Sequence, residues 1–171
     1  ETGRAGGRAK RRPAWAGAAL QVRPCTGGRD ERLPTDKYRR ENFPADVAAF
    51  HHQREELYSG ADFAIARSGA ASLVELAAFA LPSVLIPYPY AADDHQTRNA
   101  EIFAQAKAAI LLKESELGDD LLGKKIQQLL SEPAALQAMS TAVATLAPKN
   151  AADLVVDTME RYSQPHDAIA A

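Results

Sequence analysis

Two short segments have the composition of loops that bind a phosphorylated sugar. Residues 67–71 read Arg-Ser-Gly-Ala-Ala, and residues 93–96 read Asp-Asp-His-Gln. Glycine and alanine let backbone N–H groups approach a phosphate closely, and an amide side chain such as Gln96 can both donate and accept hydrogen bonds. The two segments together therefore suggest a site for a nucleotide sugar.

Alternating strands and helices must position these loops. Apolar runs at 62–66, 83–88 and 108–112 predict short buried strands, and helical spacing predicts helices from Ser72 onward and over about 95–106. Pro82 ends the first helix because proline lacks an amide donor and restricts the preceding residue. The alternation predicts an α/β fold with a parallel sheet.

Both loops are expected at one rim of that sheet. In parallel sheets ligands bind beyond the carboxyl ends of the strands, so residues 67–72 and 89–96 should face the same ligand. The first loop suits a diphosphate, because the helix after it begins with unpaired N–H groups and a positive dipole end. Arg67 adds a formal charge there unless its side chain points away.

Three motifs carry a resemblance to a known family: RSGAASLVE, LPSVLIPYPYAADDHQTRNA and FHHQREELYSGAD. Together they resemble the donor-binding half of the MurG family, over about residues 21–162. The resemblance implies a Rossmann-like parallel sheet with flanking helices, the C-terminal half of a GT-B glycosyltransferase of glycosyltransferase family 28. That family transfers N-acetylglucosamine from UDP to lipid I, which makes lipid II for the bacterial cell wall.

The resemblance also implies roles for individual residues. The acid that binds ribose falls on Glu75, the residues at the sugar hydroxyls fall on His95 and Gln96, and the pair along the uracil falls on Phe50 and His51. Arg67 is included for its charge. The loop that contacts the phosphates falls on Ser68, Gly69, Ala70, Ala71, Ser72 and Leu73.

The resemblance implies UDP-N-acetylglucosamine as the donor, with no cofactor, no metal and no nucleic-acid partner. It further implies a cytoplasmic enzyme that lies peripherally on the inner membrane and meets its lipid-linked acceptor through an N-terminal domain, which we expect this chain to lack. The family's early serine-bearing glycine loop is not found before Thr26. No residue is therefore assigned a catalytic role, and the chain alone is expected to be inactive. The alternatives are a stand-alone UDP-sugar-binding subunit of a split glycosyltransferase and a structural α/β domain without a ligand.

Several of these residues have simpler interpretations. Ser72 and Glu75 have the spacing of a helix capping box, which needs no ligand, although both roles can coexist. Gly69 could be an ordinary turn glycine. Residues 93–95 contain two carboxylates and a histidine, but carboxylates at a helix start more often cap the helix than hold a metal. Cys25 stands alone, which excludes an internal disulfide.

Composition adds broader limits. The chain has 171 residues and a net charge of −2, which gives no global attraction to nucleic acid. Residues 1–40 carry eleven Lys and Arg against four Asp and Glu, so the basic charge gathers at one end. We expect residues 1–20 to be a disordered or aberrant segment, residues 21–162 the donor-binding domain and residues 163–171 a loose tail. No secretory signal or membrane span is recognisable.

The later part of the chain predicts helices. Apolar stripes occur within 121–130, 136–146 and 154–159, and such stripes more often face a core than a partner. Helical spacing is poor before Tyr38. Two residues depart from the family's pattern, Ala80 where glycine is favoured and Lys107 in a turn of small residues.

Overall fold

The computed structural model describes residues 20–27, 32–118 and 120–163. The predictions for residues 1–19 and 164–171 lie outside these ranges. The described part is an α/β fold with a parallel sheet, as the sequence predicts.

The sheet has three strands in the order β1-β2-β3. These are β1 (Ala64–Ala66), β2 (Ser83–Leu85) and β3 (Ala109–Leu111), each inside its predicted apolar run. Ile65 pairs with Val84, and Val84 pairs with Ile110. Helix α3 (Ala70–Ala78) connects β1 to β2, and α4 (His95–Gln105) connects β2 to β3. All three strands therefore end at the same rim, where the two predicted loops lie.

Each face of the sheet carries its own apolar core. On one face, α3 and α4 pack against the sheet through buried residues such as Leu76 and Phe103. On the other face, Leu129 of α5 (Leu121–Ser131) packs near Val84. Helix α6 (Pro133–Thr145) contacts both α3 and α5 and buries Val143 completely. The stripes predicted for α5 and α6 therefore face the core, which holds the sheet and its rim rigid.

Helices α3 and α4 end in the same way at the edge opposite the rim. Ala80 follows α3 with φ of 49° and Lys107 follows α4 with φ of 58°. In each case two backbone hydrogen bonds close a Schellman motif, for example Leu81 N–H to the Leu76 oxygen at 2.9 Å. This left-handed position favours glycine because only glycine escapes the clash of a Cβ atom. The two departures from the family pattern thus place side chains at strained positions.

The described residues before the sheet contain two helices and little strand structure. Residues 22 and 25 form isolated parallel bridges, Val22 with Ala45 and Cys25 with Ala48. Helix α1 (Arg32–Arg40) forms in a stretch where the sequence predicts no helix before Tyr38. Helix α2 (Arg54–Ser59) then leads into β1.

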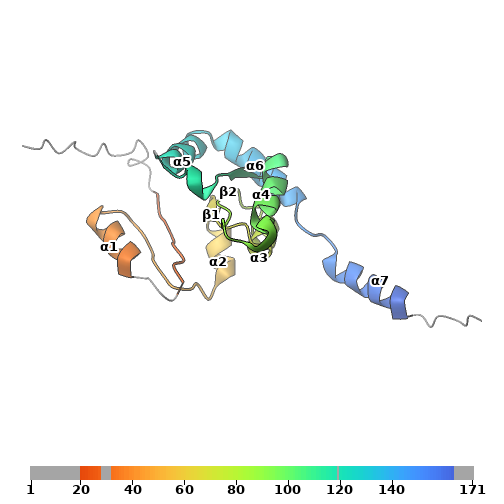
Figure 1. Cartoon of the computed structure of the whole chain (residues 1–171). Helices are drawn as coiled ribbons and strands as arrows, with labels where there is room; N and C mark the ends of the chain where they lie inside the picture. The colour runs from red at the N-terminus through yellow and green to blue at the C-terminus, as the bar shows by residue number, and fades with distance from the viewer. Residues whose placement is uncertain (1–19, 28–31, 119, 164–171) are drawn as a thin grey trace, which may run out of the picture.

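The last helix, α7 (Ala151–Ser163), corrects a prediction. Its apolar residues were expected to face the core, but all of its residues are exposed, Met159 at 66% and Tyr162 at 84%. The helix extends away from the sheet, and no element among the described residues covers it (Figure 1). Among the described residues, no helix is long and apolar enough to cross a membrane.

Candidate functional site

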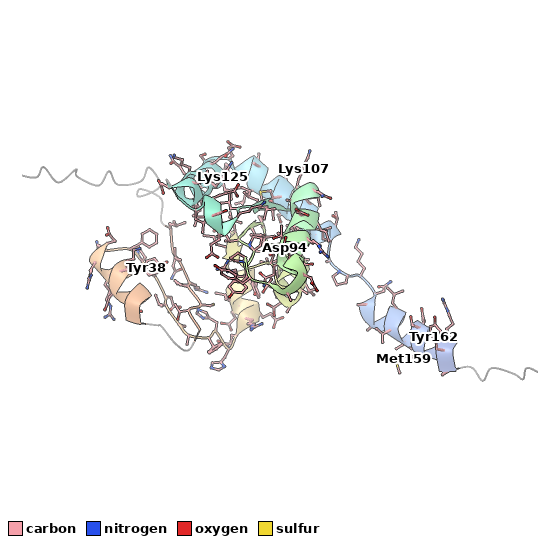
Figure 2. All side chains as sticks on the ribbon, viewed as in Figure 1. Tyr38, Asp94, Lys107, Lys125, Met159 and Tyr162 are labelled. Carbon is pink, nitrogen blue, oxygen red and sulfur yellow. The ribbon has the colours of Figure 1, made fainter. Side chains whose placement is uncertain are left out.

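The candidate site is the rim where the strands end. Three loops meet there: residues 67–69 after β1, residues 86–91 after β2 and residues 112–113 after β3. Short 3-10 helices follow the second and third loops, η2 (Ala92–Asp94) and η3 (Glu114–Glu116). Figure 2 shows Asp94 and Lys107 at opposite ends of α4, so Asp94 is at the rim and Lys107 is at the far edge.

The first loop ends in an uncapped helix start. Gly69 occupies the N-cap position of α3 with φ of −66° and ψ of 146°, and no side chain caps the helix. An α-helix leaves the N–H groups of its first turn without intrahelical partners, here those of Ala70, Ala71 and Ser72. These donors and the positive dipole end together make a surface suited to an anion.

The geometry at Gly69 does not require glycine. Its φ is negative and allowed to every residue, and a Cβ atom built on it would meet nothing within 4 Å. The backbone conformation therefore gives no steric reason for glycine here, although glycine is also a favoured N-cap residue. Open space next to the start of α3 is what close approach of a ligand to the backbone would need.

The capping-box interpretation of Ser72 is wrong in this structure. Because α3 begins at Ala70 with Gly69 as N-cap, Ser72 lies inside the first turn and its hydroxyl cannot occupy the N-cap position. Glu75 lies a turn further on and its carboxylate is engaged elsewhere. Leu73, also predicted to contact the phosphates, is buried in the core, and its backbone N–H already donates to the Gly69 oxygen at 3.1 Å.

Ser68 joins the two predicted loops. Its side chain is fully buried, and its hydroxyl donates to the main-chain oxygen of Gln96 at 2.7 Å. The Asn99 side-chain amide donates to the Ser68 carbonyl oxygen at 3.1 Å. The sequence argument placed Ser68 at the phosphate, but its hydroxyl already has this partner. Asn99 was not singled out, although its place one turn after Gln96 on the same helix is a signal that could have found it.

Arg67 crosses from β1 to the other two strands. Its Nη1 donates to the carbonyl oxygens of Ile86 and Pro87, and to Glu114 at 2.7 Å, while its guanidinium lies 5.6 Å from the Tyr88 ring centre. These contacts tie all three strand ends together. They also place a carboxylate against the positive charge that the sequence argument assigned to a ligand.

Glu75 is held by two side chains of α2. Arg54 Nη1 donates to Oε1 at 2.6 Å, and the Tyr58 hydroxyl donates to Oε2 at 2.7 Å. The hydrogen bond from Tyr58 lowers the pKa of Glu75, with Arg54 acting in the same direction and partial burial opposing both. Burial and the neighbouring carboxylate raise the pKa of Tyr58 to about 12. At neutral pH Glu75 is thus an anion and Tyr58 a donor.

The second loop presents Gln96 toward the rim. Gln96 Oε1 accepts a hydrogen bond from the Tyr88 backbone N–H at 3.0 Å, and within the described ranges its amide nitrogen forms no hydrogen bond. His95 Nδ1 lies 2.7 Å from the Ala92 oxygen. Asp94 is the N-cap residue of α4 by position, but its carboxylate accepts from the Thr97 hydroxyl instead of a backbone N–H. The described residues contain no cluster with the ligand set of a metal site.

Phe50 and His51 precede α2 directly. Phe50 is 66% exposed, and His51 Nε2 is buried without a hydrogen-bond partner among the described residues. Arg54, which contacts Glu75, follows His51 by only three residues, so the chain brings this pair close to α3. A separate hollow of about 260 Å³ lies at the other edge of the sheet, lined among others by Asp62, Pro82 and Ser140, and does not belong to this rim.

Comparison with known proteins identifies the family of this chain. A family model described as the glycosyltransferase family 28 C-terminal domain matches residues 8–155. A relative from Microcystis aeruginosa is 39% identical over 89% of this chain, and one from Synechococcus elongatus is 45% identical over 82%. Both are named UDP-N-acetylglucosamine–N-acetylmuramyl-(pentapeptide) pyrophosphoryl-undecaprenol N-acetylglucosamine transferase.

A solved structure is similar as well. The crystal structure of Acinetobacter baumannii MurG matches with a TM-score of 0.77 and 28% identity, over 83% of this chain and 41% of that one. The chain spans about two fifths of the length of the curated relatives that it matches. The chain belongs to the glycosyltransferase family 28 C-terminal domain family. Within that family it is similar to the C-terminal part of MurG.

Proposed function

We propose that this chain is the donor-binding half of a glycosyltransferase that uses UDP-N-acetylglucosamine, with residues 21–162 as the donor domain. The observation that carries the proposal is the arrangement around the start of α3. An uncapped helix N-terminus, a carboxylate one turn further on and an amide side chain from the neighbouring loop lie at one rim. The helix N-terminus suits the diphosphate, the carboxylate suits the ribose, and the amide suits the sugar hydroxyls.

The roles follow from the chemistry of each group. The N–H groups from Gly69 to Ser72 would bind the diphosphate, and Glu75 would accept hydrogen bonds from the two ribose hydroxyls. Gln96 would use its free amide nitrogen on the sugar, next to His95. Phe50 and His51 would lie along the uracil, where the exposed Phe50 ring offers a surface on which the base can pack. Ser68 and Arg67 would act mainly by fixing the loops.

For the whole enzyme we propose the transfer that its relatives' names describe, in which N-acetylglucosamine moves to lipid I and lipid II forms. The acceptor hydroxyl would attack the sugar's anomeric carbon, lose its proton to a base outside this chain, and displace UDP. Negative charge grows on the departing diphosphate, so donors fixed at the start of α3 would stabilise the transition state more than the ground state. The corresponding location is the cytoplasmic face of the bacterial inner membrane, reached through the other half.

The test is calorimetric titration of the purified chain with UDP-N-acetylglucosamine, UDP and UDP-glucose in parallel. We expect saturable binding that favours the acetylated sugar over UDP-glucose. Absence of binding to all three nucleotides would overturn the proposal for this chain. Binding without transfer, followed by transfer when a separately purified N-terminal half is added, would identify the chain as one subunit of a split enzyme.

A further inference from the structure

We propose that Arg54 and Tyr58 are positioning residues for the Glu75 carboxylate. Their two hydrogen bonds determine how strongly the site distinguishes ribose from 2′-deoxyribose. The proposal rests on the proposed function, because it assumes that Glu75 meets the ribose. It concerns residues of α2, which lie outside the loops that the motifs single out.

The contact pattern supports a shared task. Arg54 and Tyr58 are four residues apart on α2, so they lie on the same face of the helix. Each donates to a different oxygen of Glu75, at 2.6 Å and 2.7 Å. A carboxylate held at both oxygens can neither rotate nor change rotamer without breaking a hydrogen bond. Glu75 therefore has one orientation before any ligand arrives.

The hydrogen bonds from Arg54 and Tyr58 leave room for a ligand on the Glu75 carboxylate. An ionised carboxylate offers about four acceptor positions, and the two donors occupy only one position on each oxygen. The remaining positions suit two neighbouring hydroxyl groups. The Glu75 side chain retains 31% of its exposure, so these positions are open to a ligand.

The two donors differ in rigidity. Tyr58 is half-buried, and its ring packs on Phe79 with 5.4 Å between ring centres, which fixes the hydroxyl in space. The Arg54 side chain is 63% exposed, so its ion pair with Glu75 is screened by water and salt. Tyr58 should accordingly be the stronger positioning residue, and Arg54 the weaker and more salt-dependent one.

Fixed orientation creates selectivity for the diol. A carboxylate that cannot move loses a full hydrogen bond when the 2′-hydroxyl is absent, whereas a free carboxylate can turn to keep its best contact with the 3′-hydroxyl. A site built to bind a hydroxyl discriminates because its polar group would otherwise be left unpaired. Removing one of the two hydrogen bonds to Glu75 should therefore reduce the preference for UDP over 2′-deoxy-UDP, in addition to weakening binding.

The experiment measures dissociation constants of the full chain for UDP and for 2′-deoxy-UDP by calorimetry. The variants are Tyr58→Phe and Arg54→Gln, with Tyr162→Phe and Arg161→Ala on α7 as matched controls. In Tyr58→Phe we expect UDP binding to weaken by about three- to tenfold and the ratio of the two constants to fall by about threefold. Arg54→Gln should show a smaller effect that disappears at high salt, and both controls should match the wild type.

A second readout separates positioning from a general loss of structure. The Glu75 carboxyl is titrated by carbon NMR in the ligand-free chain, and its pKa should move up toward the ordinary glutamate value in Tyr58→Phe. An unchanged ratio of the two constants in both variants, with wild-type UDP binding intact, overturns the positioning role alone. If the wild type binds neither nucleotide, the proposed function fails and the positioning role fails with it. Should Tyr58→Phe not fold, the exposed Arg54→Gln variant decides by the same ratio.

Discussion

The Ser68 hydroxyl donates to the main-chain oxygen of Gln96 at 2.7 Å, from a side chain with no exposed surface. This buried hydrogen bond joins the loop after β1 to the first turn of α4. The groups proposed for the diphosphate and for the sugar are thereby fixed relative to each other before a ligand binds. Such preorganisation lowers the entropic cost of binding.

Replacing this hydroxyl should loosen the rim. We expect Ser68→Ala to lower the free energy of unfolding by about 1–2 kcal/mol, because a buried hydrogen bond is lost and a small void remains. Urea unfolding measures the change. Ser115→Ala in the exposed η3 is the control and should unfold like the wild type. Equal stability of the two variants would contradict a structural role for the bond.

Gly69→Ala should separate folding from binding. The backbone at Gly69 is allowed to alanine and a Cβ atom has open space, so the free energy of unfolding should stay within about 1 kcal/mol of the wild type. The added methyl group would stand where the diphosphate approaches, so affinity for UDP-N-acetylglucosamine should fall at least about tenfold. Gly118→Ala, also in open space, is the matched control. Unchanged affinity in Gly69→Ala would show that the diphosphate does not bind at this loop.

Removing the Glu75 carboxylate should affect both binding and stability. Glu75→Ala deletes the proposed ribose acceptor, so calorimetric affinity for UDP should weaken by about 1–3 kcal/mol. The melting temperature should fall as well, since the half-buried Tyr58 hydroxyl loses its acceptor. Glu75→Gln keeps an acceptor for Tyr58 and should recover stability but not affinity. A loss of stability with unchanged affinity would leave Glu75 a purely structural role.

The lowered pKa of Glu75 predicts a dependence of stability on pH. A carboxyl group with a folded pKa below its unfolded pKa stabilises the fold at pH values above the unfolded pKa, about 4.3. That contribution is lost as pH falls from about 5 through the folded pKa. Urea unfolding between pH 7 and pH 3 should therefore show a steeper loss in the wild type than in Glu75→Gln. Parallel curves for the two proteins would show that the Arg54 and Tyr58 contacts do not persist in solution.

The two left-handed helix ends can be relieved by glycine. Ala80→Gly and Lys107→Gly should each raise the free energy of unfolding by about 1 kcal/mol, because glycine adopts positive φ without a Cβ clash. Differential scanning calorimetry should show a higher melting temperature with unchanged UDP affinity, since both positions lie opposite the rim. Ala78→Gly, at an exposed helical position, should instead destabilise by a similar amount.

Short-range patterns were sufficient for the sheet and its rim. The strands follow from apolar runs such as 83–88, and the end of α3 before Pro82 follows from punctuation by proline. Helix α1 escaped this approach because its sequence is mostly polar and charged and includes a proline, so few apolar residues mark a helical face. The capping box failed because small residues let α3 begin two residues before Ser72.

Contacts between distant segments could not be inferred in this way. The hydrogen bonds of Ser68, Arg67 and Glu75 join residues 17 to 47 positions apart. The resemblance assigned Ser68 and Glu75 to a ligand, and the charge of Arg67 suggested the same for that side chain, whereas the structure gives each a protein partner. One feature of the sequence points to the hydrogen bonds from α2 to Glu75: the spacing of Arg54 and Tyr58 places them on a single helical face.

The outer position of β1 has a consequence for how this chain behaves in solution. Among the described strands, β1 pairs only with β2, and its central residue Ile65 is 47% exposed. An open strand offers a row of main-chain donors and acceptors to any other extended segment, and proteins usually guard such edges with lysine, proline or a bulge. Here β1 is protected by its length of three residues and by the flanking charges of Asp62 and Arg67, although Arg67 is already engaged with Glu114. The open edge can therefore pair with only a few residues of another extended segment, which limits self-association through β1.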